Sequence, residues 1–175
     1  MNRIFRILCP LVLGAAVVGC SDQGPVAQDS SVVASQGDHR AGDVVLALNA
    51  DDQKVLTTVG KRIPGQGLIG NGAGGYLAFG PYAALDSGAY MLTVYGTLTV
   101  PAPQNAVVVD VVHAQGSVQD AKVIFDRGAE PDGNRPVLIR LKFDMRQAAQ
   151  DVEFRVLLQP GARATMTGYK VTVGG

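Results

Sequence analysis

Residues 137–144 read VLIRLKFD, and this stretch decides the expected fold because its apolar side chains recur at every second position. An extended chain places successive side chains on opposite faces. One face of this stretch carries the apolar residues Val137, Ile139, Leu141 and Phe143. The other face carries the polar residues Arg140, Lys142 and Asp144. The alternation predicts a β-strand with one buried and one solvent-facing side.

The same period of two recurs along the chain. Residues 152–158 read VEFRVLL, with Phe154 and Val156 on the apolar face and Glu153 and Arg155 on the polar face. Further strands are expected at 44–49, 54–59, 76–84, 88–96, 106–113, 119–126 and 167–173. Residues 146–150 are the one place where a single helical turn is expected.

Turn-forming residues separate these segments, as in the Pro-Asp-Gly-Asn sequence at 131–134. Many short alternating strands between such turns are typical of an antiparallel β-sandwich or jelly roll. We therefore expect one all-β domain over residues 43–175, with Ile139, Leu141, Phe154 and Val156 in the core between two sheets.

The charge balance excludes some partners. The chain has 15 Lys and Arg against 15 Asp and Glu, and without the first 19 residues it would have 13 against 15. A chain so close to neutral lacks the basic surface that nucleic acid requires. It also lacks the polybasic surface that would hold it to anionic lipid.

The N-terminus is typical of a secretory signal. Residues 1–6 carry two arginines, 7–18 are mainly apolar, and small residues precede Cys20. The sequence VVGC at 17–20 resembles the bacterial lipobox, in which the cysteine is lipidated and becomes the new N-terminus. The resemblance implies a signal peptide at 1–19, lipid on Cys20 and a flexible linker over 20–42. The alternative is an ordinary secreted protein whose signal happens to contain a cysteine.

The resemblance to lipoproteins also bears on location. By similarity to enterobacterial lipoproteins, Ser21 after the cysteine favours the outer membrane. Several acyl chains on one residue give durable membrane attachment. The expected location is therefore the cell envelope, at the outer membrane by this criterion, with the domain facing the periplasm or the cell surface.

A second resemblance lies in the domain. Residues 80–82 read GPY and 88–94 read GAYMLTV, which is similar to a strand of galactose-binding-like jelly-roll domains and carbohydrate-binding modules. The strand at 154–156, the Pro-Gly turn at 160–161 and the strand at 168–171 are similar to their last two strands. The resemblance implies a jelly roll that binds sugar without catalysis. Such modules often stack sugar on Trp, and this chain has none.

Catalytic and cofactor motifs are weak. The GNGAGG sequence at 70–75 fits a dinucleotide-binding pattern, but a strand follows it where a helix is needed, so a glycine loop is expected. His39 and His113 have no metal-ligand spacing. Asp110 could serve as a glycosidase acid, although no partner carboxylate is identifiable. We expect no enzyme activity, no cofactor and no metal.

The polar faces of the strands are the remaining candidates for a binding site. They present the charged residues Asp110, Arg140, Lys142, Glu153 and Arg155. If their strands are neighbours, these groups line one sheet. That face is either simply solvated, as most outer sheet faces are, or a groove that hydrogen-bonds sugar hydroxyls with Tyr82 or Tyr95 as an apolar platform.

Two functions follow from these alternatives. The first is a lipid-anchored, non-catalytic binding module for an envelope glycan. The second is a structural or interaction subunit of an envelope export or assembly complex, which binds a protein partner through an apolar patch.

Overall fold

A computed structural model describes residues 39–174 of the chain. The predicted signal peptide, Cys20 and the predicted linker up to residue 38 lie outside the described residues. The described residues form twelve strands and no helix. Consequently, no helix within 39–174 has the length and apolar character to cross a bilayer. The strands are β1 (Val44–Asn49), β2 (Gly60–Ile63), β3 (Gly67–Asn71), β4 (Gly75–Ala78), β5 (Pro81–Leu85), β6 (Gly88–Leu98), β7 (Val107–His113), β8 (Val118–Phe125), β9 (Ala129–Asp132), β10 (Arg135–Met145), β11 (Ala149–Leu158) and β12 (Arg163–Val173).

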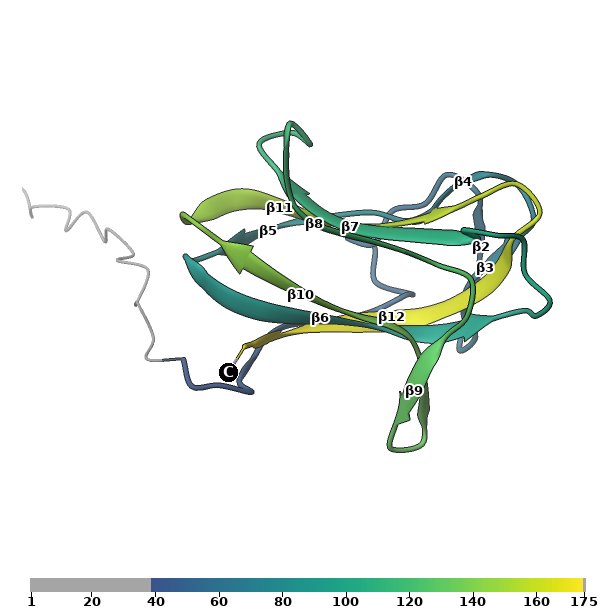
Figure 1. The fold of residues 1–175 in the computed structure, drawn as a ribbon, viewed down its shortest axis with the longest axis horizontal. Coiled ribbons are helices and arrows are strands. Elements are labelled where there is room, and N and C mark those ends of the chain that lie inside the picture. The colour runs from purple at the N-terminus through teal and green to yellow at the C-terminus, as the bar shows by residue number, and fades with distance from the viewer. Residues whose placement is uncertain (1–38, 175) are drawn as a thin grey trace, which may run out of the picture. The chain divides into compact units, whose positions relative to one another are not determined.

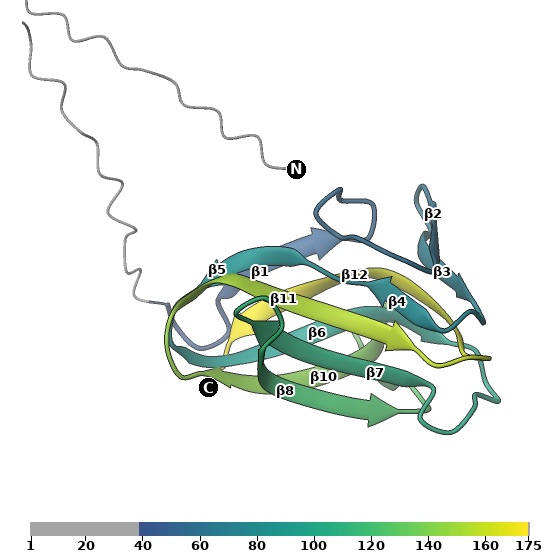
Figure 2. The ribbon, with the colours of Figure 1, turned by 90° about the horizontal axis from the view of Figure 1, so that it is seen from above.

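The strands pair into two antiparallel sheets that lie face to face. The seven-stranded sheet has the order β2-β3-β12-β6-β10-β9, with β1 also paired to β12. The five-stranded sheet has the order β4-β11-β7-β8, with β5 also paired to β11. Figure 1 shows the two layers edge-on, and Figure 2 shows β11 and β7 crossing the middle of the five-stranded sheet. The predicted antiparallel β-sandwich of jelly-roll type is confirmed.

The core lies between the two sheets and follows the period of two. Leu141 and Phe143 from β10 are buried there, as are Phe154 and Val156 from β11. Ile139 is partly buried against the same cluster. A chain of ring contacts crosses the core, with centroid distances of 5.4 Å for Tyr90–Phe143, 6.0 Å for Phe143–Phe154 and 5.6 Å for Phe154–Tyr169. These apolar contacts hold the sheets together without any disulfide among the described residues.

Three expectations about local structure are wrong. Residues 54–59 form a loop with an isolated bridge from Leu56 to Phe79, because the Arg62 guanidinium donates hydrogen bonds to the carbonyls of Ala50, Asp52 and Val55. The glycine loop expected at 70–75 is shorter than predicted, because β3 includes Gly70 and Asn71 and β4 begins at Gly75, which leaves residues 72–74 as the loop. No helical turn forms at 146–150, because only three residues separate β10 from β11.

The period-two alternation did not predict the β2–β3 hairpin, for a physical reason. Its strands are four and five residues long and contain glycines, so the alternation is too short to recognise. Gly67 has φ of 97°, and a Cβ there would collide with the carbonyl of Met166 in β12. The hairpin therefore depends on close approach to a strand about a hundred residues away.

Candidate functional site

The structure divides the seven candidate residues between the two sheets. Four of them belong to the five-stranded sheet, namely Tyr82, Asp110, Glu153 and Arg155. Three belong to the seven-stranded sheet, namely Tyr95, Arg140 and Lys142. The reason is that β10 pairs with β6 and β9, whereas β11 pairs with β7, β4 and β5. The candidates therefore lie on two opposite outer faces and do not form one site.

The outer face of the five-stranded sheet carries a row of charged side chains across three strands. In β7, Val109 and Val111 point into the core, so Asp110 between them faces outward. Arg155 of β11 is opposite Asp110 on one side, and Lys122 of β8 is opposite it on the other. The sheet register thus places the Asp110 carboxylate between two cations, one on each neighbouring strand.

Asp110 and Arg155 form a two-pronged ion pair. The Arg155 Nε donates to Oδ1 at 2.8 Å, and Nη2 donates to Oδ2 at 2.6 Å. The side chains are only 11% and 21% exposed, respectively. The hydrogen bonds that Arg155 donates to Asp110 raise the pKa of the Arg155 guanidinium further above its ordinary value. Such bidentate pairs fix geometry more strongly than a single contact does.

A depression of about 690 Å³ surrounds this pair, and we call it the Asp110 groove. Its apolar surface comes from Tyr76, Val108, Ile124 and Leu157. Its polar surface comes from Gln104, Asn105, Asp110, Gln119, Lys122, Arg155 and Gln159, and Pro103 and Pro160 complete it. The groove contains one carboxylate, so it lacks the pair of acids that glycoside hydrolysis requires.

A strained turn stands at one end of the same face. Ala114 and Gln115, between β7 and β8, have φ of 51° and 57°, which L-residues rarely adopt. Their backbone N–H groups donate to the Asp151 carboxylate at 3.1 and 2.9 Å. These bonds lower the pKa of Asp151. Figure 1 shows this turn rising above the five-stranded sheet, and a Cβ on Gly116 would lie 3.5 Å from the Arg155 guanidinium.

Tyr82 and Glu153 lie beside this row of charges. Tyr82 follows Pro81, which pairs with Glu153 of β11. The Tyr82 ring is 50% exposed, and its φ of 63° is unusual for an aromatic residue. Burial raises the pKa of Glu153, and burial together with the Glu153 charge raises the pKa of Tyr82. Tyr82 is therefore an exposed aromatic ring fixed in place next to a carboxyl group.

Tyr95 has a different environment, because it is only 3% exposed. Its hydroxyl donates to Asp132 at 2.9 Å, and the Lys170 ammonium donates to the same carboxylate at 3.1 Å. The Arg135 guanidinium lies 3.7 Å from the centre of the Tyr95 ring. The ring is thus covered and offers no open stacking surface.

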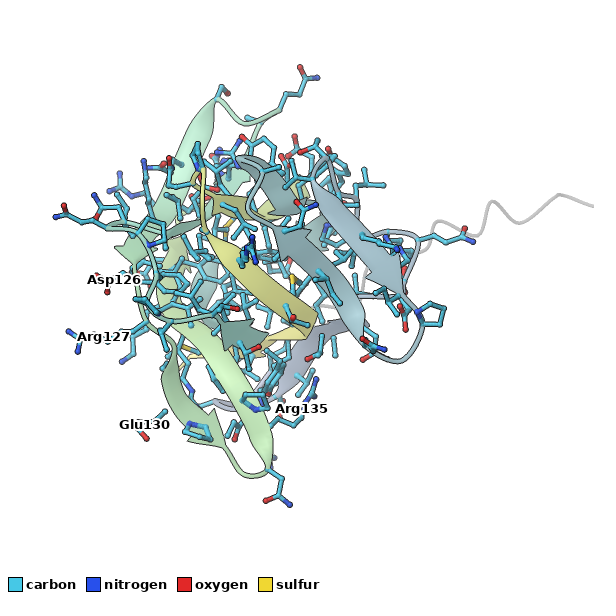
Figure 3. The ribbon with its side chains drawn as sticks, turned by 90° about the vertical axis from the view of Figure 1, so that its right-hand side faces the viewer. Asp126, Arg127, Glu130 and Arg135 are labelled. Atoms are coloured by element: carbon cyan, nitrogen blue, oxygen red, sulfur yellow. The ribbon has the colours of Figure 1, made fainter. Side chains whose placement is uncertain are left out.

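Arg140 and Lys142 share the outer face of the seven-stranded sheet with this cluster. Arg140 donates to the Glu130 carbonyl at 2.9 Å, which ties β9 to β10. Lys142 is exposed. Figure 3 shows Asp126, Arg127 and Glu130 pointing outward from the segment between β8 and β10, whereas Arg135 covers the Tyr95 ring. The contacts of Tyr95 and Arg140 therefore serve to hold the β9–β10 hairpin.

Several groove residues were missed by sequence reasoning. Lys122 lies between Ala121 and Val123, which pack on the core, so alternation places it on the outer face. Leu157 faces outward between the buried Val156 and Leu158 in the same way. Tyr76 and Asn105 carried no such signal, because tertiary pairing brings their segments to the groove.

His113 lies at the end of β7 and is nearly buried. It is 7% exposed, and its Nδ1 lies 2.7 Å from the Asp120 carboxylate. Within residues 39–174, no group of three or more His, Cys, Asp or Glu side chains could hold a metal ion.

Comparison with known proteins adds one structural likeness. No family model matches the chain, and no curated protein matches it. Among solved structures, the chain is similar to the carbohydrate-binding module of lichenase 5A from Cellvibrio mixtus, which was solved in complex with cellotriose. The identity is 12%, the TM-score is 0.46, and the match covers 76% of this chain and 100% of the other.

Replacing either member of the Asp110–Arg155 pair by Ala should lower the free energy of unfolding by about 2–4 kcal/mol, because the remaining charge is left largely desolvated. The double variant D110A/R155A should cost less than the sum of the two single changes by about 1–3 kcal/mol. Urea unfolding of all four proteins measures this coupling. Two purely additive losses would contradict the pairing.

Acid should remove the contribution of Asp151 to stability. Its pKa is lower in the folded chain than the ordinary 3.8, so ionised Asp151 stabilises the fold above that pH and loses this effect as the pH falls. We expect Asp151→Asn to be less stable than the unchanged protein at neutral pH, and the difference to shrink as the pH falls below the ordinary pKa of 3.8. Thermal unfolding across this range is the measurement. A difference that stays constant down to pH 2 would show that the carboxylate does not hold the turn.

Proposed function

We propose that the Asp110 groove binds a glycan and that the protein is a non-catalytic binding module. The observation that carries the proposal is the combination of a fixed carboxylate–guanidinium pair with apolar side walls in one open groove. Sugars present hydroxyl groups that both donate and accept hydrogen bonds, together with apolar ring faces. A groove lined by Asp110, Arg155 and Tyr76 offers partners for both.

Tyr82 extends this surface along β11. Glu153 and Arg155 are two residues apart on the same face of the strand, which separates them by about 7 Å. The Tyr82 side chain is next to that of Glu153, which lies on the face of β11 that carries Arg155. The exposed Tyr82 ring and the groove therefore occupy the same side of the sheet. A ligand that follows β11 would meet aromatic and charged groups in turn. We therefore favour a chain of several sugar units over a single sugar.

The anchor belongs to the same proposal. The charged start, the apolar stretch and the lipobox-like VVGC sequence support a signal peptide at 1–19 and lipid on Cys20. The protein would then be held in the cell envelope, at the outer membrane, with the domain on the periplasmic or outer side. A linker over 20–42 would separate the domain, 43–175, from the bilayer.

Binding of a protein partner is the second candidate function. It predicts a continuous apolar patch. The large apolar side chains exposed within 39–174 are Val44, Leu56, Tyr82, Val100, Val118 and Ile124. They come from β1, from two loops, from β5 and from the two ends of β8. This scatter favours the glycan proposal.

Affinity electrophoresis of the full-length chain through gels that contain soluble polysaccharides tests the proposal. Suitable probes are dextran, laminarin, alginate and polygalacturonate. We expect at least one to retard the protein, and Tyr76→Ala to weaken that binding about tenfold or more, because the ring is a wall of the groove. Tyr76→Phe keeps the ring and should bind within about twofold of the unchanged protein.

A control variant separates loss of binding from general damage. Ile69→Ala alters a half-buried apolar residue of β3 in the seven-stranded sheet and should leave retardation unchanged. Absence of binding to every probe at about millimolar repeat-unit concentration would overturn the proposal, since it would leave less than about 4 kcal/mol of binding free energy for the groove. Equal weakening by Tyr76→Ala and Ile69→Ala would also count against the groove.

A further inference from the structure

The charges that line the Asp110 groove do not cancel. Asp110, Arg155 and Lys122 are the ionisable groups with a formal charge at neutral pH in its lining. Both carboxylate oxygens of Asp110 accept hydrogen bonds from Arg155, so this pair is internally neutralised. Lys122 takes part in none of the ion pairs found among residues 39–174. One positive charge is left over in the groove.

The position of Lys122 makes this charge available to a ligand. The residue is opposite Asp110 in the β7–β8 register and is exposed at the groove wall, beside Ile124. Arg155 has a spare donor as well, because its bonds to Asp110 use Nε and Nη2, and Nη1 makes no hydrogen bond within residues 39–174. The groove can therefore donate to an anion from two sides of Asp110.

The acids of β8, of β11 and of the turns beside them do not line the groove. Asp120 lies 2.7 Å from His113, and the Asp151 carboxylate accepts the backbone bonds of the β7–β8 turn. Glu153 lies outside the groove lining, next to Tyr82. Asp126, which follows β8, is likewise outside the groove lining.

We infer that the groove is selective for an acidic glycan, one that carries carboxylate or phosphate groups, and that Lys122 pairs with the acidic group. This inference rests on the proposed function of the groove. A neutral sugar would displace water from the Lys122 ammonium and offer it only hydroxyl groups as hydrogen-bond partners, with no opposite charge. An acidic group in the same place supplies the opposite charge, and its attraction weakens as salt is added.

The test compares polysaccharides that differ only in charge. Polygalacturonate and alginate are paired with esterified forms of the same polymers, in which the carboxylates are blocked, and a polymer of glycerol phosphate serves as the phosphate probe. The full-length protein is measured by affinity electrophoresis at low and moderate salt. At low salt we expect at least one acidic polymer to bind about threefold or more tightly than its esterified or neutral counterpart, and salt to reduce this preference.

Lys122→Gln should abolish the preference for acidic polymer, whereas Lys122→Arg should keep it. The matched control is Lys142→Gln, which removes an exposed lysine from the opposite sheet and should leave the preference unchanged. Equal losses in Lys122→Gln and Lys142→Gln would overturn the inference, because they would indicate attraction by net charge alone.

The two proposals fail in different ways. Binding of neutral and acidic polymers with equal affinity, unaffected by Lys122→Gln but weakened by Tyr76→Ala, would overturn the acidic selectivity and leave the glycan groove standing. Failure to bind any polymer, acidic or neutral, would overturn both.

Discussion

The ion pair between Asp110 and Arg155 is the interaction on which the rest of the candidate site depends. It joins β7 and β11, the two strands at the centre of the five-stranded sheet, on the face that points away from the core. Val108 and Leu157 lie beside it on the same face. A charged pair in such surroundings has few waters to compensate either group, so each partner needs the other. The pair therefore fixes the floor of the groove in one geometry.

The backbone around the Asp110–Arg155 pair is also held in a fixed conformation. The β7–β8 turn holds two residues in a left-handed conformation, and Asp151 from the neighbouring strand accepts their N–H groups. Tyr82 and Asn105 also have positive φ, and both flank the five-stranded sheet. Backbone strain of this kind persists where surrounding contacts impose it, and it concentrates at binding sites. All four non-glycine residues with positive φ in 39–174 lie around the outer face of the five-stranded sheet.

Sequence reasoning predicted the sandwich because period-two alternation is a local property. The apolar face of 152–158 is the one that the structure buries, and so is that of 137–144 from Ile139 onward, whereas a register shift between Val137 and Ile139 puts Leu138 in the core cluster in place of Val137. Alternation says which face a residue occupies but not which strand lies next to it. Arg140 and Arg155 have the same pattern and lie on different sheets, since strand pairing is decided by contacts that are distant along the chain.

The same limit explains the outcome for the tyrosines. Tyr82 and Tyr95 are both followed by small residues in alternating segments, yet one is half exposed and the other is buried. Tyr95 is covered by Arg135, which comes from a hairpin forty positions further along. Lys122 and Leu157 could have been assigned to the outer face from alternation alone. Tyr76 and Asn105 could not, because they reach the groove only through the pairing of β4 with β11 and the path of the loop before β7.

Assignment of the ligand to one face is the central claim, and amide chemical-shift mapping tests it most directly. The isotope-labelled protein would be titrated with the polysaccharide fragment that binds best. The account predicts that the backbone amides of Asp110, Lys122 and Arg155 shift with the same saturation curve, while those of Lys61, Ile69 and Lys142 on the other sheet stay in place. Shifts confined to the seven-stranded sheet or to the β9–β10 hairpin would contradict it.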